Sequence, residues 1–520
     1  MVLTLGVSMI IVDATVVNVA IPTIINDLGL SAPDAEWMNT IYSLVFAALL
    51  ISIGRAGDLW GRRRLFVAGV IVFVAASMWA GRAGSAQSLI AARLVQGVGG
   101  AMILPSTLSS VNAMFRGRER AIAFGVWGSV IGGMAALGPL VGGWLTTDHS
   151  WRWIFYINVP VGFLAVVVAL RLVPETRDEH ASRGLDVAGV LTSTLGLGAL
   201  VFSLIEGQRY GWWRPTGDFS ALGLEWPLRE LSVVPVGFLT AAVLLGAFVV
   251  AERRRSRAGL PVVVDLEMFR IVSFRNGNMA ALVVSLGELG LIFALPLFIQ
   301  SVLGYSALQT GWVFVALAAG AFVAGGLAAQ LAAAHGSRRV VLIGMATEVV
   351  GLSGVAVLLS ATVSGWTLAA PLFVYGMGVG LATAQLTNAI LVDVPPAKSG
   401  QASGLQSTFR QVGSALGIAI LGTLLVVGLS TRTASGLDDV ADLPPEARDA
   451  ITTLVRVTAG AALPGIREMP DSGEIVEVIE DAYVASARTV AIGAALFILA
   501  GLAAAVRLPQ HREPEPAGTG

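Results

Sequence analysis

Long apolar stretches, separated by short polar segments, dominate the pattern along the chain. A helix needs about 20 apolar residues to cross the roughly 30 Å hydrocarbon core of a bilayer. Stretches of that length occur at 2–24, 37–54, 65–82, 88–111, 121–144, 153–172, 187–206, 232–251, 276–299, 310–332, 340–359, 367–392, 404–427 and 486–506. The pattern therefore predicts an all-α integral membrane protein with 14 transmembrane helices.

The basic residues fall mainly on alternate loops, which orients the predicted helices. If both termini are cytoplasmic, the inner loops hold Arg55, Arg62, Arg63, Arg64, Arg116, Arg118, Arg120, Arg171, Arg177, Arg183, Arg253, Arg254, Arg255, Arg257, Arg270, Arg275, Arg338, Arg339 and Lys398. The short outer loops hold only Arg82, Arg152, Arg209, Arg214 and Arg229. Because cytoplasmic loops carry an excess of Lys and Arg, we expect a multi-pass protein of the cell membrane with both termini in the cytoplasm.

An internal repeat divides the chain into two halves. Residues 97–143 and 376–422 share glycines at a constant offset of 279 (376 − 97). Two parallel halves with a substrate site between them are a recurrent transporter plan. We therefore predict a six-helix half at 1–172, a linker with two inserted helices at 173–275, and a second six-helix half at 276–506. A long extracytoplasmic loop at 428–485 interrupts the second half, and a cytoplasmic tail at 507–520 follows it.

The composition excludes several classes of function. Hydrophobic residues make up 55% of the chain and charged residues 13%, against about 25% charged in a soluble domain. A formal net charge of −1 gives no long-range attraction for nucleic acid. The chain has no cysteine, and its 4 histidines are not spaced as a metal-ligand set. We therefore expect neither an enzyme nor a bound metal or cofactor.

Five motifs in order resemble those of the major facilitator superfamily, specifically its fourteen-span drug:proton antiporters. They are Asp13–Pro22 (DATVVNVAIP), Gly54–Arg64 (GRAGDLWGRRR), Arg93–Pro105 (RLVQGVGGAMILP), Gly133–Gly143 in the fifth span and Trp151–Gly162 (WRWIFYINVPVG). The likeness runs from the first span to the last. It implies a major facilitator fold of two six-helix halves plus two inserted central helices.

Asp13 and Arg93 are the candidate proton-coupling residues in the first half. An acid in mid-membrane costs about 2.5–3.5 kcal/mol on insertion scales, and such residues are functional by default. Arg93 and Gln96 lie three residues apart, on one face of the fourth span, and the resemblance links this arginine to proton transfer, with Gln96 as a candidate cavity-lining residue. The alternatives are a structural acid satisfied by neighbouring helices and a packing arginine bonded to carbonyls.

The loop between the second and third spans carries a candidate gating motif of Gly54, Asp58, Gly61 and Arg62. Its glycines permit close backbone approach or a tight turn. The resemblance implies that Asp58 and Arg62 make charge contacts that hold the two halves together in one of the alternating states. A basic loop that only orients the chain is the alternative. Ala56 and Leu59 stand where the family usually has leucine and a basic residue, so the partner of Asp58 stays open.

The fifth span carries the candidate antiporter motif of Gly138, Pro139, Gly142 and Gly143. Glycine lets a neighbouring helix pack against bare backbone, and proline bends a helix. The resemblance implies a bend that limits leak. Helix packing alone is the structural alternative.

Four polar residues in the second half are further candidates. Glu288, near the middle of the ninth span, is the best second acid for proton coupling or for a cationic substrate. Glu348, Gln406 and Arg410 are candidate cavity-lining residues, and Arg410 could instead extend to the cytoplasmic interface.

These observations predict a proton-coupled antiporter that exports small amphipathic organic molecules, as in multidrug efflux and antibiotic resistance, by alternating access. Its expected partners are a small-molecule substrate, protons and the lipid bilayer, and we expect a monomer. An exporter of an endogenous metabolite or lipid on the same fold is the alternative. A non-transporting membrane sensor is less favoured, because no soluble stretch is long enough for a convincing effector domain.

Overall fold

The computed structural model describes residues 2–30, 32–178, 186–217, 219–221, 224–228, 230–440, 443–470 and 472–509. The helices before the linker are α1 (Val2–Leu28), α2 (Ala32–Trp60), α3 (Arg62–Gly81), α4 (Ala86–Met114), α5 (Gly117–Asp148), α6 (Trp153–Tyr156) and α7 (Asn158–Leu172). The linker holds α8 (Val187–Tyr210), the strands β1 (Ser220–Ala221) and β2 (Leu224–Glu225), α9 (Val233–Arg257) and the 3₁₀ turn η1 (Leu266–Arg270). After it come α10 (Val272–Ser301), α11 (Ala307–His335), α12 (Ser337–Leu358), α13 (Ala369–Leu391), η2 (Pro396–Lys398), α14 (Ser399–Leu437), α15 (Pro445–Val457), α16 (Leu463–Arg467) and α17 (Gly473–Ala505).

Each predicted span overlaps a helix of the structure, with α6 and α7 together forming the sixth. Within the described residues, 12 helices are long and apolar enough to cross a membrane. The remaining two predicted spans correspond to α1, with 27 residues, and α5, with 32. Several side chains of α1 and α5 lie outside the described part, so 14 crossings remain a prediction.

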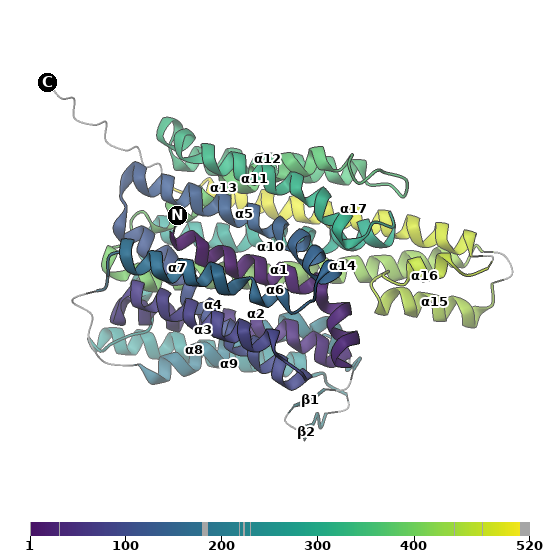
Figure 1. The fold of residues 1–520 in the computed structure, drawn as a ribbon, viewed down its shortest axis with the longest axis horizontal. Coiled ribbons are helices and arrows are strands. Elements are labelled where there is room, and N and C mark those ends of the chain that lie inside the picture. Colours follow the sequence, from purple (N-terminus) through teal and green to yellow (C-terminus); the bar gives the residue numbers. More distant parts are fainter. Residues whose placement is uncertain are drawn as a thin grey trace.

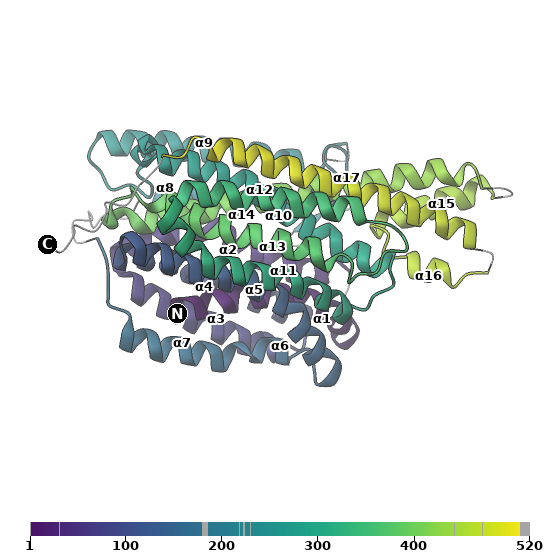
Figure 2. The same cartoon turned by 90° about the horizontal axis from the view of Figure 1, so that it is seen from above.

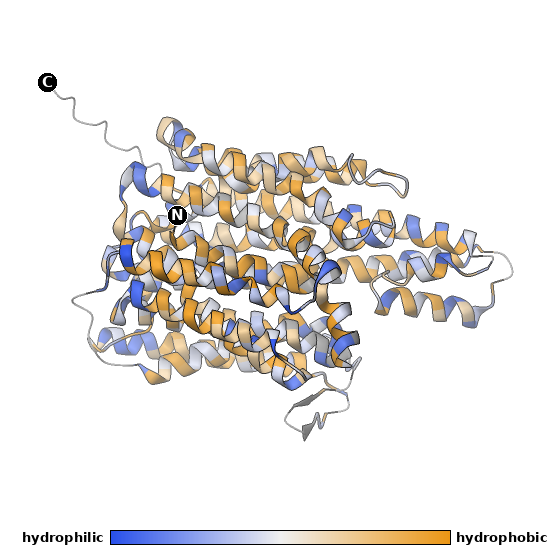
Figure 3. Ribbon diagram, in the orientation of Figure 1, coloured by the Kyte–Doolittle hydropathy of each residue, from blue (hydrophilic) through white to orange (hydrophobic). Residues whose placement is uncertain are grey.

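The long helices run side by side, and α1 begins at the same end of the bundle at which α17 ends (Figure 1). The loops between α2 and α3, α4 and α5, and α9 and α10 also lie at this end. We call it the basic end, because Arg62, Arg116 and Arg253 lie in or beside these loops with their basic neighbours. Apolar residues cover the length of the helices, and the hydrophilic residues gather toward the two ends (Figure 3). This is the distribution that a bilayer-spanning bundle requires.

Glycines of the sequence repeat lie at corresponding helix crossings in the two halves. Gly97 of α4 packs against the backbone oxygen of Tyr42 on α2, and Gly376 of α13 packs against that of Leu317 on α11. In the same way, α5 packs on α1 through Gly138, and α14 packs on α10 through Gly417. This correspondence supports the predicted division into two duplicated halves.

The inserted helices lie against the outside of the bundle rather than within either half (Figure 2). α8 packs on α2 of the first half and on α14 of the second, while α9 packs on α8. One polar contact in this packing joins the hydroxyls of Ser52 and Thr194, 3.2 Å apart. The linker pair therefore contacts both halves at once.

The segment predicted as a loop at 428–485 is largely helical. α14 continues to Leu437 and α17 begins at Gly473, so both helices extend well past their predicted span ends. These extensions project beyond the rest of the bundle, with α15 and α16 packed beside them (Figure 1). The predicted extracytoplasmic segment therefore includes the ends of two long helices, because helices need not stop at the apolar core of their spans.

Candidate functional site

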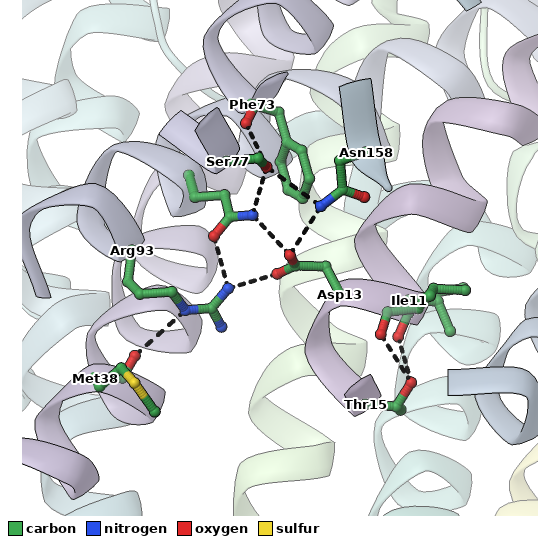
Figure 4. Close-up of polar contacts among 10 residues, drawn as sticks. Ile11, Asp13, Thr15, Met38, Phe73, Ser77, Arg93 and Asn158 are labelled. Carbon is green, nitrogen blue, oxygen red and sulfur yellow. Dashed lines mark hydrogen bonds and ion pairs between the residues drawn. The ribbon is translucent and has the colours of Figure 1, made fainter. Parts of the chain in front are cut away.

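Asp13 lies near the middle of α1 and is 1% exposed. Figure 4 shows its carboxylate surrounded by side chains from three other helices. One guanidinium nitrogen of Arg93 on α4 lies 2.5 Å from Asp13 Oδ2. The amides of Gln96 and Asn158 donate to Oδ1 over 2.7 Å and 3.1 Å. A buried carboxylate that accepts one charged and two neutral hydrogen bonds is well compensated for its loss of water.

The Arg93 guanidinium is fully buried and has partners besides Asp13. It donates to the side-chain oxygen of Gln96 at 2.7 Å and to the backbone oxygen of Met38 at 3.4 Å. It also lies over the ring of Tyr42, 4.3 Å from the centroid, a favourable cation–π position. Arg93 therefore joins α1 and α2 to α4.

Ser77 of α3 completes the cluster. Its hydroxyl accepts from Gln96 at 2.9 Å and from Asn158 at 3.2 Å, and it donates to the backbone oxygen of Phe73 at 2.8 Å. We call Asp13, Ser77, Arg93, Gln96 and Asn158 the Asp13 cluster. Sequence reasoning found three of its members and missed Ser77 and Asn158, although Asn158 lies inside the motif at the start of the sixth span.

The fifth-span glycines lie directly beside this cluster. Gly138 packs against Thr15 of α1, and Gly142 packs against Val16. A β-carbon at either position would overlap its neighbour. Gly143 faces α11 instead, near Leu308. Pro139 lies in the helical part of α5, and its side chain falls outside the described residues. The glycine motif therefore lets α5 approach α1 within one turn of Asp13.

Asp58 joins the two halves at the basic end. Its side chain is fully buried and accepts the backbone N–H groups of Gly400 at 2.8 Å and Gln401 at 2.9 Å. These are unpaired donors in the first turn of α14, where the helix dipole favours a negative charge. Arg62 donates to the same carboxylate at 2.6 Å and to the backbone oxygen of Pro396 at 2.8 Å. The partner of Asp58 that the sequence left open is therefore the N-terminus of α14.

The two motif glycines allow this contact. Gly54 packs against the backbone of Gly400 and Gly404, so α2 and α14 touch without intervening side chains. Gly61 has a φ of 109°, in the left-handed region that favours glycine. This turn places α3 so that Glu175 accepts the backbone N–H groups of two of its first residues.

The linker is attached to the same region. Glu252 of α9 accepts the backbone N–H groups of Val263 and Val264 at 3.3 Å and 3.2 Å. The side chain of Gln401 accepts from the backbone of Asp265 at 2.8 Å, and Asp265 also pairs with Lys398. Separation of α2 from α14 would therefore disturb the linker as well.

The polar candidates of the second half form a separate group. Glu288 of α10 lies 3.4 Å from the guanidinium of Arg410 on α14, so Arg410 points into the bundle rather than to the interface. Gln406 donates to the hydroxyl of Thr387 at 3.1 Å. Glu348 of α12 is fully buried. Of these candidates, the structure brings Glu288 and Arg410 into contact, and none of their hydrogen bonds or ion pairs within the described residues reaches the Asp13 cluster.

Asp27, near the C-terminal end of α1, lies outside the Asp13 cluster and has its own hydrogen-bond donors. Asp27 accepts from the indole N–H of Trp151 at 2.9 Å and from Arg152 at 2.7 Å. These hydrogen bonds hold the pKa of Asp27 below its ordinary value of 3.8. This contact fixes the end of α1 against the loop that follows α5. Within the described residues, no group of three or more acids and histidines is arranged to hold a metal ion.

Several known proteins resemble this chain in sequence. A probable actinorhodin transporter of Streptomyces coelicolor is 34% identical over 82% of this chain and 72% of its own length. The tetracenomycin C resistance and export protein of Streptomyces glaucescens is 32% identical over 98% of this chain and 92% of its own. The multidrug resistance protein Stp of Mycobacterium tuberculosis is 32% identical over 84% of this chain and 76% of its own length. All three are named as resistance or transport proteins.

The fold is also similar to that of a solved transporter. The human organic anion transporter MFSD10 superimposes with a TM-score of 0.59 at 12% identity, covering 96% of this chain and 98% of the other. At that identity the likeness concerns the fold alone. The family model described as Major Facilitator Superfamily matches residues 3–418. With this family match and relatives above 30% identity along most of its length, this chain belongs to the Major Facilitator Superfamily.

Proposed function

We propose that this protein is a proton-coupled antiporter that exports small amphipathic organic molecules by alternating access. The observation that carries the proposal is the fully buried pair of Asp13 and Arg93 in mid-bundle. Ionisable residues at that depth mark proton or ion pathways. The relatives named for antibiotic export and multidrug resistance support the direction and the substrate class.

Protonation of Asp13 is the coupling step. A proton on the carboxylate removes the negative charge that faces Arg93 at 2.5 Å. The guanidinium keeps its contacts with Gln96, the Met38 carbonyl and the Tyr42 ring, so it stays with α4 while its hold on α1 weakens. Because α5 packs on α1 within one turn of Asp13, the change reaches α5 directly. A ligand shifts a conformational equilibrium only through such differential contacts.

The Asp58 contact with α14 holds the protein closed at the basic end. Opening this end requires α2 and α14 to separate and the hydrogen bonds from Gly400 and Gln401 to break. We infer that the protein alternates between this state and one open at the basic end. The substrate enters from the basic end and leaves at the opposite one.

The basic end faces the cytoplasm, by the excess of arginine in its loops, and the chain crosses the cell membrane 14 times as a monomer. Single cysteines test the orientation, since the chain has none of its own. In intact cells, an impermeant thiol reagent should label Thr216→Cys and Glu474→Cys but not Arg177→Cys. Labelling of Arg177→Cys, or of only one of the other two, would contradict this topology.

The proton gradient is sufficient for the task. One pH unit supplies about 1.4 kcal/mol per proton, and a potential of 100 mV adds about 2.3 kcal/mol per charge. One or two protons therefore concentrate a neutral solute several hundred-fold or more.

The proposal is tested in proteoliposomes with an imposed pH gradient and a panel of dyes, antibiotics, metabolites and lipids. We expect uphill movement of at least one amphipathic compound that stops when an ionophore removes the gradient. Transport of a metabolite or lipid alone would mean that this compound class, and not drug-like molecules, is the substrate. Transport that ignores the gradient would refute proton coupling.

A further inference from the structure

The second half contains a buried acid that the coupling step does not use. Glu348 of α12 is fully buried, and both of its carboxyl oxygens lack a hydrogen-bond partner within the described residues. It lies opposite Gly378 of α13, whose missing β-carbon lets the two helices cross closely. The hydroxyl of Tyr375, one turn earlier on α13, is also buried without a partner.

Two carboxyl groups share one cation here. The charges of Glu348, Glu288 and Arg410 interact, but only Glu288 is in contact with Arg410, at 3.4 Å. The charged groups on the other helices that pack on α12 are distant: His335 ends α11, and Arg488 of α17 bonds the Leu359 carbonyl beyond the end of α12. Arg410 therefore contacts Glu288, and no cation or N–H group in the described part donates a hydrogen bond to Glu348.

An ionised carboxylate in this position would carry an uncompensated charge in an apolar interior. The cost of such a charge is far larger than the cost of holding the group as a neutral acid. A proton on Glu348 would remove this cost in the conformation described here.

Hydroxyl side chains of α14 lie between Arg410 and the basic end. Ser407 and Ser403 lie four residues apart on one face of α14, and both hydroxyls are buried without partners in the described structure. Ser399 continues the same face at the start of the helix, where it accepts from Asn112. Hydroxyls both donate and accept protons. The Arg410 side chain, 20% exposed, marks the partly accessible part of the group.

From these observations we propose that Glu348 is a second proton-binding site, independent of Asp13, so that export of one substrate molecule moves two protons. This inference rests on the proposed antiport function. Glu348 carries its proton while the basic end is closed. When that end opens and water enters along the α14 hydroxyls, the O–H bond breaks, the proton passes to this water, and the carboxylate is left in contact with it.

The test is the proton stoichiometry of wild type and Glu348→Gln in proteoliposomes, measured as the pH gradient that just balances a tenfold gradient of a neutral substrate. With two protons the balancing gradient is about half a pH unit, and with one it is about one unit. We expect a balancing gradient of about half a pH unit for wild type and about one unit for Glu348→Gln. The matched control is Glu206→Gln, another fully buried acid in a membrane helix, which should keep the wild-type value.

Infrared spectroscopy of the purified protein tests the protonation state without transport. The carbonyl band of protonated carboxylic acids should be present in wild type at neutral pH and should lose one component in Glu348→Gln. If Glu348→Gln does not fold, Glu348→Asp replaces it, and the band should move to the position of a protonated aspartic acid.

The outcomes separate the two proposals. An unchanged stoichiometry in active Glu348→Gln, or an infrared band that neither variant alters, would overturn the second site. Wild-type liposomes that ignore the pH gradient would refute the antiport function, while the infrared result would still decide whether Glu348 holds a proton.

Discussion

The two halves of this protein bury an acid beside an arginine in very different surroundings. In the first half, Asp13 accepts hydrogen bonds from Arg93, Gln96 and Asn158. In the second, Glu288 meets Arg410 at 3.4 Å, and Glu348 has no donor among the residues described. A proton that binds the first carboxylate must therefore break an existing set of hydrogen bonds, whereas a proton on Glu348 removes the cost of a buried charge that has no donor.

The same kind of helix crossing carries different side chains in the two predicted halves. Gly99 of α4 packs against Phe73 of α3, and Gly378 of α13, its equivalent at the repeat offset (378 − 99 = 279), packs against Glu348 of α12. Gly69 and Gly344 pack against the backbone oxygens of the same two glycines. The helix crossing is therefore repeated, but its chemistry is not. An aromatic side chain stands at this point in one half and an acid in the other.

The largest expected effect of a single change is in the first half. Arg93→Ala leaves Asp13 buried without its cation, and removal of one partner of a buried pair costs about 3–5 kcal/mol. We expect a correspondingly large loss of stability in thermal unfolding of the purified protein at neutral pH. Arg410→Ala should cost less, because its contact with Glu288 is longer and partly exposed.

A double substitution sharpens this prediction. Asp13→Asn combined with Arg93→Ala removes both charges, so it should recover part of the stability that Arg93→Ala alone loses. Equal stability of the single and double variants would mean that the pair is not the source of the loss. Equal losses of stability in Arg93→Ala and Arg410→Ala would mean that the two acid–arginine pairs do not differ in strength.

A smaller effect is expected where the halves meet. A β-carbon in Gly54→Ala would overlap the backbone oxygen of Gly400, and overpacking costs about 1–3 kcal/mol. The cost falls only on the state closed at the basic end, so that state should lose about 5–150-fold in population. The measurement is the alkylation rate of Ala402→Cys, which is fully buried in the closed state. Gly246→Ala, which has open space around it, should leave the rate unchanged.

The smallest effect concerns Asp27 at the far end of α1. Its pKa is lowered by Trp151 and Arg152, so its ionised form stabilises the fold above its ordinary value of 3.8, and this contribution disappears as pH falls through the lowered pKa. Asp27→Asn should lower the unfolding temperature slightly at pH 7, and the difference from wild type should vanish in acid. If the difference in unfolding temperature persists unchanged in acid, it comes from packing and not from the charge of Asp27.

Much of this molecule could be predicted from the sequence, because membrane helices need long apolar runs and those runs are visible. Asp13 and Arg93 could be paired in advance through their motifs, although 80 positions separate them. The partner of Asp58 could not be predicted, since it is a backbone N–H 342 positions away. The surroundings of Glu348 also depend on how α12 is rotated against α13. Hydropathy does not reveal that rotation when a helix is apolar on nearly every face.

Coupling through Asp13 is the central claim, and Asp13→Asn in proteoliposomes tests it most directly. Two rates are measured on the same preparation: substrate exchange without a gradient, and uphill export driven by a pH gradient. We predict that exchange persists, because an amide still accepts from Arg93 and keeps the helices together, while uphill export falls to the level of protein-free liposomes. Uphill export by Asp13→Asn at the wild-type rate would contradict the account.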